Sequence, residues 1–489
     1  MGVLLAIPAS ILLIHHSRSR GALTRYKAEL KAKGAKLTFT ELEIPPSTNL
    51  EQVSSREIFA TNTFPAPTVI PSVMEMVAAG QARVAWRGNL HLAPGTGAKS
   101  AGQVGWAELE SQNEGFASKL EKFRGALEDP APDTGWMYQR ATLPWRRPKF
   151  NFVSARAVAQ GLLSMEICEL HRGNLPAAVT NLHALAGMAQ LNRNELTLVS
   201  HMIRIAISDL GLRGTWEALQ APNWDDEQLA RLQRDWEQVN LLEAIERGFL
   251  GERAFGSAFM EKVRKSRGRE FSRFFSFTSI VPPSGATKTN IAVQRLLRDQ
   301  IVATAYRATS MDEDELFYLS HVSRLVEATE SLKANRPWSE VGPVVSNLFT
   351  ELEVSLKDVY HRRFMVSQIS IPNSIKAIRR AVQVETLRRL TIVAIALKRF
   401  ELRHGHAAPS LTALVPEFLS EVPVDLMSAR PLCYRPNEAG SFILYSVGED
   451  GKDDGGQSGS DLWSGPDAVW PSAASEEPPA TAAKAMEIR

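Results

Sequence analysis

The sequence predicts a multidomain, mainly α-helical protein. Three observations support this fold class: an apolar run at the N-terminus, a proline- and glycine-rich stretch over residues 37–150, and helical spacing of apolar residues over 151–375. A chain of 489 residues is long enough for several domains. The 56 basic and 54 acidic side chains nearly balance. We therefore expect no nucleic acid partner, because such a protein should carry a clear basic excess.

Residues 1–36 are predicted to form a membrane anchor followed by a basic stem. The run from Gly2 to Ile14 is almost wholly apolar, and seven basic residues follow it between Arg18 and Lys36. This run is shorter than the ~20 residues of a membrane-spanning helix, and it lacks the features of a cleaved signal peptide. We favour an uncleaved anchor, followed by a short helix over Leu23–Lys33. The alternative is a buried N-terminal helix.

Residues 37–150 are predicted to be an irregular segment wrapped on the helical body. Prolines and glycines interrupt every periodic pattern here except the one between Trp106 and Leu127. A small β-containing domain is the alternative. Residues 94–100 resemble a phosphate-binding loop, but Ala98 occupies the position of an essential glycine, which favours a flexible surface loop.

Residues 151–375 are predicted to form an α-helical domain of about eight helices. Steps of four, four and three place four apolar residues on one face of its first helix: Ala159, Leu163, Ile167 and Leu170. Residues 171–174 interrupt the pattern, and Pro176 suits the first turn of a second helix. The two helices resemble one tetratricopeptide-type hairpin, although no repeat is sustained after it.

Further helices are predicted to begin near Asp225, Lys288, Asp312 and Pro337. Ser310 and Glu313 have the spacing of a capping box, and acidic residues after Ser310 suit the positive end of a helix. We therefore interpret the run from Asp312 to Glu315 as a helix start, in preference to a catalytic pair of carboxylates.

Other clusters of chemically active residues have ordinary interpretations. The basic run from Lys262 to Arg273 contains aromatic residues and could bind single strands or anionic lipid, but acidic neighbours favour a solvated helix end. Three histidines on successive predicted helices are expected to be ordinary core or surface residues: His171, His183 and His201. The two cysteines, Cys168 and Cys433, are expected to be buried free thiols.

An acidic, glycine-rich loop near the C-terminus is the strongest candidate site. It places five carboxylates within thirteen residues: Glu449, Asp450, Asp453, Asp454 and Asp461. A flexible loop rich in oxygen atoms suits a hard cation such as calcium, which takes six to eight oxygen ligands. The alternative is a solvated acidic turn.

The order of residues around this loop resembles the globular domain of major (G-type) pseudopilins of type II secretion. Ser446, Gly448, Asp450 and Gly451 match one family pattern, and Asp425, Pro431 and Tyr434 match another. The chain departs from the family at Leu426 and Ala429, where proline and glycine are expected. The resemblance covers roughly the last fifth of the chain.

This resemblance implies a small α+β domain over residues 376–465. It implies calcium binding by Asp450 and Asp461. The family pattern does not require acidic residues at Asp453 and Asp454, which are further candidate ligands because they belong to the same acidic loop. The helix in front of the domain contains many charged residues and should pack one apolar side on a core. We therefore expect a reused module and no assembly into a pilus. Residues 466–489 are predicted to be a disordered tail.

Two classes of function remain open. The first is a membrane-anchored, non-enzymatic protein of the cell envelope, linked to secretion or envelope assembly, with unknown protein partners. Its bulk would lie outside the cytoplasm, in the periplasm, although the basic stem favours the opposite orientation. The alternative is a hydrolase-like envelope enzyme with its site between the irregular segment and the helices. The overall organisation also resembles membrane-anchored proteins of planctomycete and verrucomicrobial type.

Overall fold

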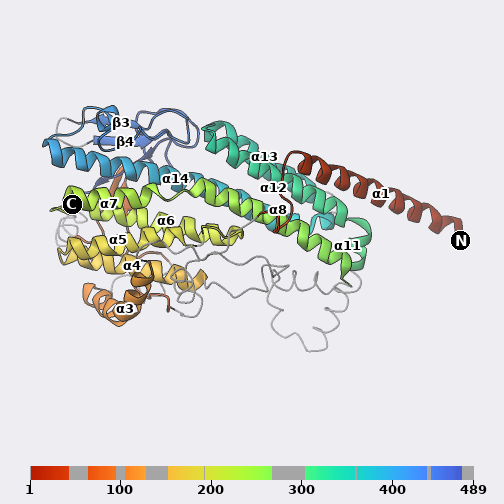
Figure 1. Cartoon of the computed structure of the whole chain (residues 1–489), viewed down its shortest axis with the longest axis horizontal. Helices are drawn as coiled ribbons and strands as arrows, with labels where there is room; N and C mark the ends of the chain where they lie inside the picture. The colour runs from red at the N-terminus through yellow and green to blue at the C-terminus, as the bar shows by residue number, and fades with distance from the viewer. Residues whose placement is uncertain are drawn as a thin grey trace, which may run out of the picture.

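The computed structural model describes residues 2–42, 64–94, 105–127, 152–191, 193–266, 303–357, 361–437 and 442–475. At residues 2–14, 126, 356, 361 and 362 it describes the backbone alone. Most of this chain is helical, and short strands complete the fold (Figure 1). The prediction of a mainly α protein is therefore confirmed.

The helices pack side by side in an elongated bundle (Figure 1). In the described part of the chain they are α1 (Gly2–Ala32), α3 (Trp106–Leu127), α4 (Phe152–His171), α5 (Leu175–Gln190), α6 (Leu198–Leu219), α7 (Asp226–Glu237), α8 (Leu241–Lys265), α11 (Ala303–Thr309), α12 (Met311–Lys333), α13 (Trp338–Lys357) and α14 (Ser367–His404), with short 3₁₀ helices η4 (His361–Phe364) and η5 (Leu411–Leu414).

The hairpin of α4 and α5 forms where the sequence predicts it. Asn174 caps α5 by accepting a hydrogen bond from the backbone N–H of Ala177 (3.4 Å), and Pro176 lies in the first turn. A first-turn proline is favourable because its missing N–H would have no helical partner. Helix α6 packs against both helices of the hairpin.

Helix α14 joins the helical body to the C-terminal domain. It packs against α6, α7, α8, α12 and α13, and also against strand β4 (Phe442–Ser446) and η5. Leu390, Val393 and Leu397 are buried as predicted, but Ile392 and Ile395 are buried too. The prediction of a helix packed on one side only is therefore wrong, since the bundle and the C-terminal domain both cover it.

The strands of the described residues form two three-stranded sheets. In the C-terminal sheet, β4 pairs antiparallel with both β3 (Cys433–Pro436) and β5 (Ala468–Val469). In the other sheet, β2 (Gln81–Arg83) pairs antiparallel with β1 (Glu75–Ala78) and parallel with β6 (Ser472–Ala473). Residues 64–94 are thus closer to the β-containing alternative than to the irregular segment.

The tail prediction is wrong for residues 466–475. These residues form β5 and β6, and Trp470 between the strands is only 7% exposed. The indole N–H of Trp216 on α6 donates to the carbonyl of Pro471 (2.8 Å). This segment is ordered because its apolar area is buried and its backbone is paired, although its composition alone suggested disorder.

Helix α1 is a single helix that continues through the predicted short helix of the basic stem. Leu23 and Leu30 in its second half are buried, and α1 packs against α11 and α12. Its first half extends past the bundle toward the N-terminus (Figure 1). Among the helices that the structure describes, none combines the length and the apolar character that a membrane span requires.

Candidate functional site

The acidic loop between β4 and β5 folds around Asp467, a residue that sequence analysis did not single out. Its carboxylate accepts hydrogen bonds from the backbone N–H groups of Asp454 (3.4 Å), Gly456 (2.8 Å) and Gln457 (2.9 Å). Three donors converging on one carboxylate fix the path of the loop. The sequence gives no signal for this role, because Asp467 lies outside the matched motif.

The predicted calcium ligands divide into two groups. Asp450 and Asp454 line a pocket of about 500 Å³, together with Glu449 and Arg379 of α14. Arg379 pairs with Glu449 (Nη2–Oε2, 2.8 Å), so one of the acidic groups at this pocket is already neutralised.

The other two predicted ligands do not line this pocket. The carboxylate of Asp453 accepts hydrogen bonds from the hydroxyl of Tyr445 (2.9 Å) and the N–H of Gly455 (2.9 Å). Asp461 accepts one from the N–H of Trp463 (2.8 Å). Across the described residues, no three side chains of the usual metal-binding types gather at one point. Calcium binding by this loop stays a prediction.

Asp425 connects the two motifs that carry the pseudopilin resemblance. The residue is fully buried, and its carboxylate accepts hydrogen bonds from the Ser446 hydroxyl (2.7 Å) and from the N–H groups of Val447 (3.0 Å) and Met427 (3.0 Å). A buried carboxylate requires such donors, because each replaces lost hydration. This residue therefore holds the start of the acidic loop against the preceding turn.

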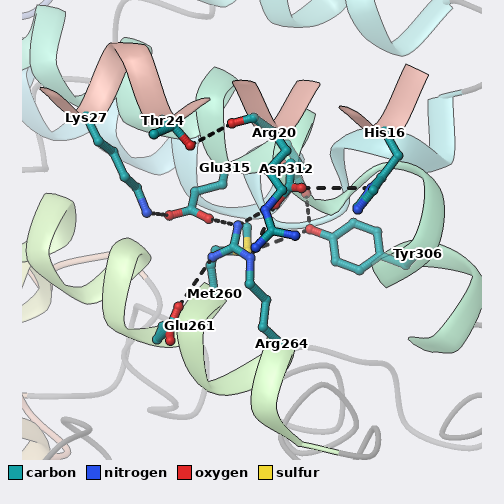
Figure 2. Close-up of polar contacts among 11 residues, drawn as sticks. His16, Arg20, Thr24, Lys27, Met260, Glu261, Arg264, Tyr306, Asp312 and Glu315 are labelled. Atoms are coloured by element: carbon teal, nitrogen blue, oxygen red, sulfur yellow. Dashed lines mark hydrogen bonds and ion pairs between the residues drawn. The ribbon is translucent and has the colours of Figure 1, made fainter. Parts of the chain in front are cut away.

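A buried polar cluster, which sequence analysis interpreted as a simple helix start, lies at the N-terminal end of α12 (Figure 2). We call it the α12 cluster: Lys27, Arg264, Tyr306, Asp312, Asp314 and Glu315. Glu315 is fully buried and pairs with Lys27 of α1 and Arg264 of α8. Arg264 also binds Asp312 (Nη2–Oδ1, 2.6 Å). Three helices are thus joined through ion pairs whose carboxylates are buried, while Lys27 and Arg264 remain partly exposed.

Asp314 occupies the other side of this cluster. Its carboxylate accepts hydrogen bonds from the Tyr306 hydroxyl (2.7 Å), the Val366 N–H (2.8 Å) and the Ser367 N–H (3.2 Å). Burial raises the pKa of this carboxyl group to about 6, against the effect of these donors. The predicted capping box is wrong, because the Ser310 side chain makes no capping hydrogen bond.

The basic run that includes Arg264 is therefore not a solvated helix end throughout. Arg264 is largely buried among carboxylates, whereas Lys265 is exposed and pairs with Glu261 (2.9 Å). The part of the run beyond residue 266 lies outside the described residues, as do the glycine-rich loop at 95–100 and the helix predicted from Lys288. Arg264 is largely buried by α1 and α12, and both helices are distant from it in the sequence, so its neighbours in the chain do not reveal this burial.

Glu166 and Glu217 are two buried carboxyl groups that sequence analysis did not identify. Both are fully buried. Glu217 accepts hydrogen bonds from the N–H groups of Met74 (2.7 Å) and Ala85 (2.8 Å), and burial raises its pKa to about 8. Burial, reinforced by the charge of Glu217, raises the pKa of Glu166 well above its usual range. Among the residues that the structure describes, neither carboxyl oxygen of Glu166 has a hydrogen-bond partner.

The three histidines do not converge. His171 stacks on Trp106 with ring centroids 3.7 Å apart, and His183 pairs with Asp235. His201 is fully buried beside the Glu195 carbonyl (2.7 Å), and burial lowers its pKa to about 3. Each histidine therefore has its own structural environment.

The two cysteines are free thiols, as predicted. Cys168 is buried, and the side-chain amide of Asn113 donates a hydrogen bond to its sulfur (3.2 Å). Burial raises the pKa of this thiol to about 11, which disfavours the reactive thiolate. Cys433 is only half-buried, in strand β3.

Comparison of the chain with protein-family models, curated proteins and solved structures finds no match. Function therefore has to be inferred from the chemistry of the sites described above.

Proposed function

We propose that this chain is a membrane-attached, non-enzymatic scaffold of the cell envelope that presents a pseudopilin-like C-terminal domain to protein partners. The observation that carries the proposal is the backbone geometry at the motif positions. Ala429, where the family has glycine, has φ 58°. Gly448 has φ 70°, and the Pro466 carbonyl oxygen lies 1.8 Å from where a Cβ would be. These positions favour glycine for physical reasons, which supports the resemblance.

The arrangement of α14 supports a scaffold. A long helix packed against a small antiparallel sheet is the order expected of a pseudopilin-like module. Here, however, the helix is fixed within the bundle by ion pairs to neighbouring helices, including Arg399 with Asp226 of α7 (2.7 Å) and Arg380 with Asp209 of α6 (2.7 Å). A helix held in this way presents the C-terminal domain in one orientation and is not available for assembly into a pilus.

The geometry near Glu217 favours this function over the hydrolase alternative. That alternative requires reactive groups between the N-terminal segment and the helices. Glu217 lies there, but its two oxygens bind the backbone of Met74 and Ala85. A carboxyl group occupied in this way positions β1 and β2 and is poorly placed to act on a substrate.

Membrane attachment is supported by α1. Its first half extends beyond the bundle (Figure 1), and residues 2–14 are almost wholly apolar. Fractionation of bacterial cells tests this part of the proposal. We expect the full chain in the membrane pellet, released by detergent but not by alkaline carbonate, and a variant lacking residues 2–14 in the supernatant. Recovery of the full chain in the supernatant would contradict membrane attachment.

The second part of the proposal is that the C-terminal domain contacts protein partners. A photo-crosslinking amino acid placed at exposed Lys452, beside the acidic pocket, tests it. Exposed Lys122 on α3 is the matched control position. We expect crosslinks to discrete envelope proteins from position 452 and only diffuse background from position 122. Equal patterns at the two positions would argue against a partner at this domain.

A further inference from the structure

A second pocket, of about 440 Å³, lies among α1, α8, α11 and α12. This volume is within the range of small-molecule sites. Most of its polar lining is basic: His16, Arg20, Arg264 and Arg307. Thr304 contributes a hydroxyl group, and Asp312 is the acidic residue of the lining. The pocket thus adjoins the α12 cluster on the side of α1 (Figure 2).

The guanidinium groups of this lining differ in how many of their N–H donors are already bound to other groups of the protein. Arg264 is paired with Asp312 and Glu315. Arg307 donates to the backbone carbonyl of Ser266, an uncharged acceptor. Within the described part of the chain, neither Arg20 nor Arg307 is ion-paired with an acidic side chain. Each guanidinium has five N–H donors, so both arginines retain donors for a ligand.

The local charges leave a positive excess at the pocket. Three guanidinium groups line it, those of Arg20, Arg264 and Arg307, and Asp312 is the one acidic side chain of the lining. Three positive groups and one negative group leave an excess of two among the lining residues, with His16 counted as neutral. Behind this lining, Glu315 pairs with Lys27, and Asp314 accepts a hydrogen bond from Tyr306. Further out, Glu261 pairs with Lys265 (2.9 Å) and lies 3.7 Å from Arg264, and Glu313 pairs with Arg363 (3.3 Å).

We propose that this pocket binds a phosphate-bearing anion, with Arg20 and Arg307 as its principal ligands. A guanidinium donates two parallel hydrogen bonds to a phosphate group, and this geometry makes arginine the preferred residue for such ligands. The hydroxyl of Thr304 adds a further donor. Two groups approaching from α1 and α11 would enclose the anion between helices that are separate in sequence.

The anion has two possible sources, a lipid headgroup or a soluble phosphate compound. Arg20 follows the apolar run on the same helix, roughly 9 Å beyond Ile14 at the rise of an α-helix. The headgroup layer is about 5 to 7 Å thick on each side of the hydrocarbon core. The backbone of Arg20 would thus lie a few ångström outside this layer, a gap that a long arginine side chain can span. A phospholipid at the membrane surface is therefore within reach of Arg20 if α1 inserts. Binding of a soluble phosphate does not require membrane attachment.

The first arm of the test measures the melting temperature of the full chain, purified in detergent, as inorganic phosphate is increased. Chloride at equal ionic strength is the reference. Phosphate should stabilise the wild-type protein, because it binds the folded state. R20Q and R307Q should each require about tenfold more phosphate for the same shift, since each removes a charged hydrogen-bond donor. R25Q removes the same charge from an exposed position of α1 outside the pocket and should behave as wild type.

The second arm measures flotation of the same proteins with phosphatidylcholine vesicles, with and without phosphatidylglycerol. A lipid source predicts that phosphatidylglycerol increases flotation of the wild-type and R25Q proteins but not of R20Q and R307Q. A soluble source predicts the phosphate effect alone, whether or not the chain binds vesicles. The proposal is overturned if the wild-type protein responds to neither anion, or if R20Q and R307Q match R25Q in both arms.

Discussion

Asp425 and Glu166 are both buried carboxyl groups. Within the described residues, Asp425 accepts hydrogen bonds and Glu166 has no donor. The first is a motif residue that the sequence already indicated. The second lies on α4, outside every motif of the sequence. Local sequence does not reveal which atoms a buried side chain will meet. Glu166, Arg264 and Asp467 were missed for this reason.

Replacing Asp425 by asparagine should destabilise the C-terminal domain. Asparagine has an NH₂ group in place of one carboxylate oxygen, and this group would face at least one of the donors from Ser446, Val447 and Met427. The buried hydrogen bonds to a charged acceptor would therefore be lost. We expect a loss of about 1.5–3 kcal/mol in unfolding free energy, measured by urea denaturation. Asp450→Asn at the exposed loop is the control and should change stability by less than about 0.5 kcal/mol. Equal effects would remove the structural role assigned to Asp425.

Stability should fall as the pH rises from about 4 towards 8, because burial raises the pKa of both Glu217 and Glu166. An unfolded glutamate has a pKa of about 4.3, whereas that of folded Glu217 is about 8. Between these values the folded state keeps a proton that the unfolded state has lost. The stabilisation is full below about pH 4 and is lost as pH rises through 8, by up to about 1.4 kcal/mol per pH unit for each group.

Glu166→Met tests this account, since it replaces an unpartnered buried carboxyl group by an apolar side chain of similar length. Its unfolding free energy should decline less between about pH 5 and pH 8.5 than that of the wild type, and it should be the more stable protein at the upper pH. Exposed Glu108→Met should leave the pH dependence unchanged. A parallel decline in wild type and Glu166→Met would show that Glu166 does not contribute.

At the scale of elements, the positions at which helices begin were predicted better than the segments that pack against each helix. Helix α3 has the predicted bounds, and Asp225 caps α7 in a capping box with Gln228. These features depend on hydrogen bonds between residues a few positions apart, so a short stretch of sequence contains both partners. The two-sided burial of α14 and the pairing of β2 with β6 depend on distant segments, so periodicity and composition gave the wrong expectation.

The packing of α8 against α12 depends on a glycine that leaves room for an aromatic ring. A Cβ on Gly256 would lie 2.1 Å from a ring carbon of Tyr318, which is itself buried. Gly256→Ala should therefore cost about 1–3 kcal/mol through overpacking. Gly115→Ala on α3 is the control, since a Cβ there meets nothing within 4 Å. This control should be neutral or stabilise by up to about 1 kcal/mol, and a destabilised control with an unaffected Gly256→Ala would contradict the packing.

At the scale of the whole molecule, one hydrophobic core extends from α1 to the C-terminal sheet. The predicted boundary between residues 375 and 376 falls inside α14. The C-terminal domain therefore shares its core with the helical body. For this reason, the calcium prediction is best tested on the full chain. Melting with calcium should occur at a higher temperature than melting with a chelator, and identical melting would remove calcium from consideration.

Residues 468–475 should stabilise the whole protein, although they were predicted to be disordered. Deleting 468–489 removes β5, β6 and buried Trp470, and should cost about 3–5 kcal/mol, as expected for the loss of a buried tryptophan. Deleting only 476–489 is the matched control. Calorimetry of the two truncated chains should show a lower melting temperature for the longer deletion. Equal melting temperatures would mean that the two strands contribute nothing.

The parallel pairing of β2 with β6 has a consequence for synthesis of the protein. Gly80 and Ser472, which are joined at this sheet, lie 392 residues apart. At 5–20 residues per second, a ribosome needs roughly 20 to 80 s to make the intervening chain. During that interval the edge of β2 has no partner, and an unpaired strand edge invites contact with other chains. Each newly made molecule therefore passes through a period in which misassembly competes with folding, and slower initiation or a bound chaperone should raise the yield.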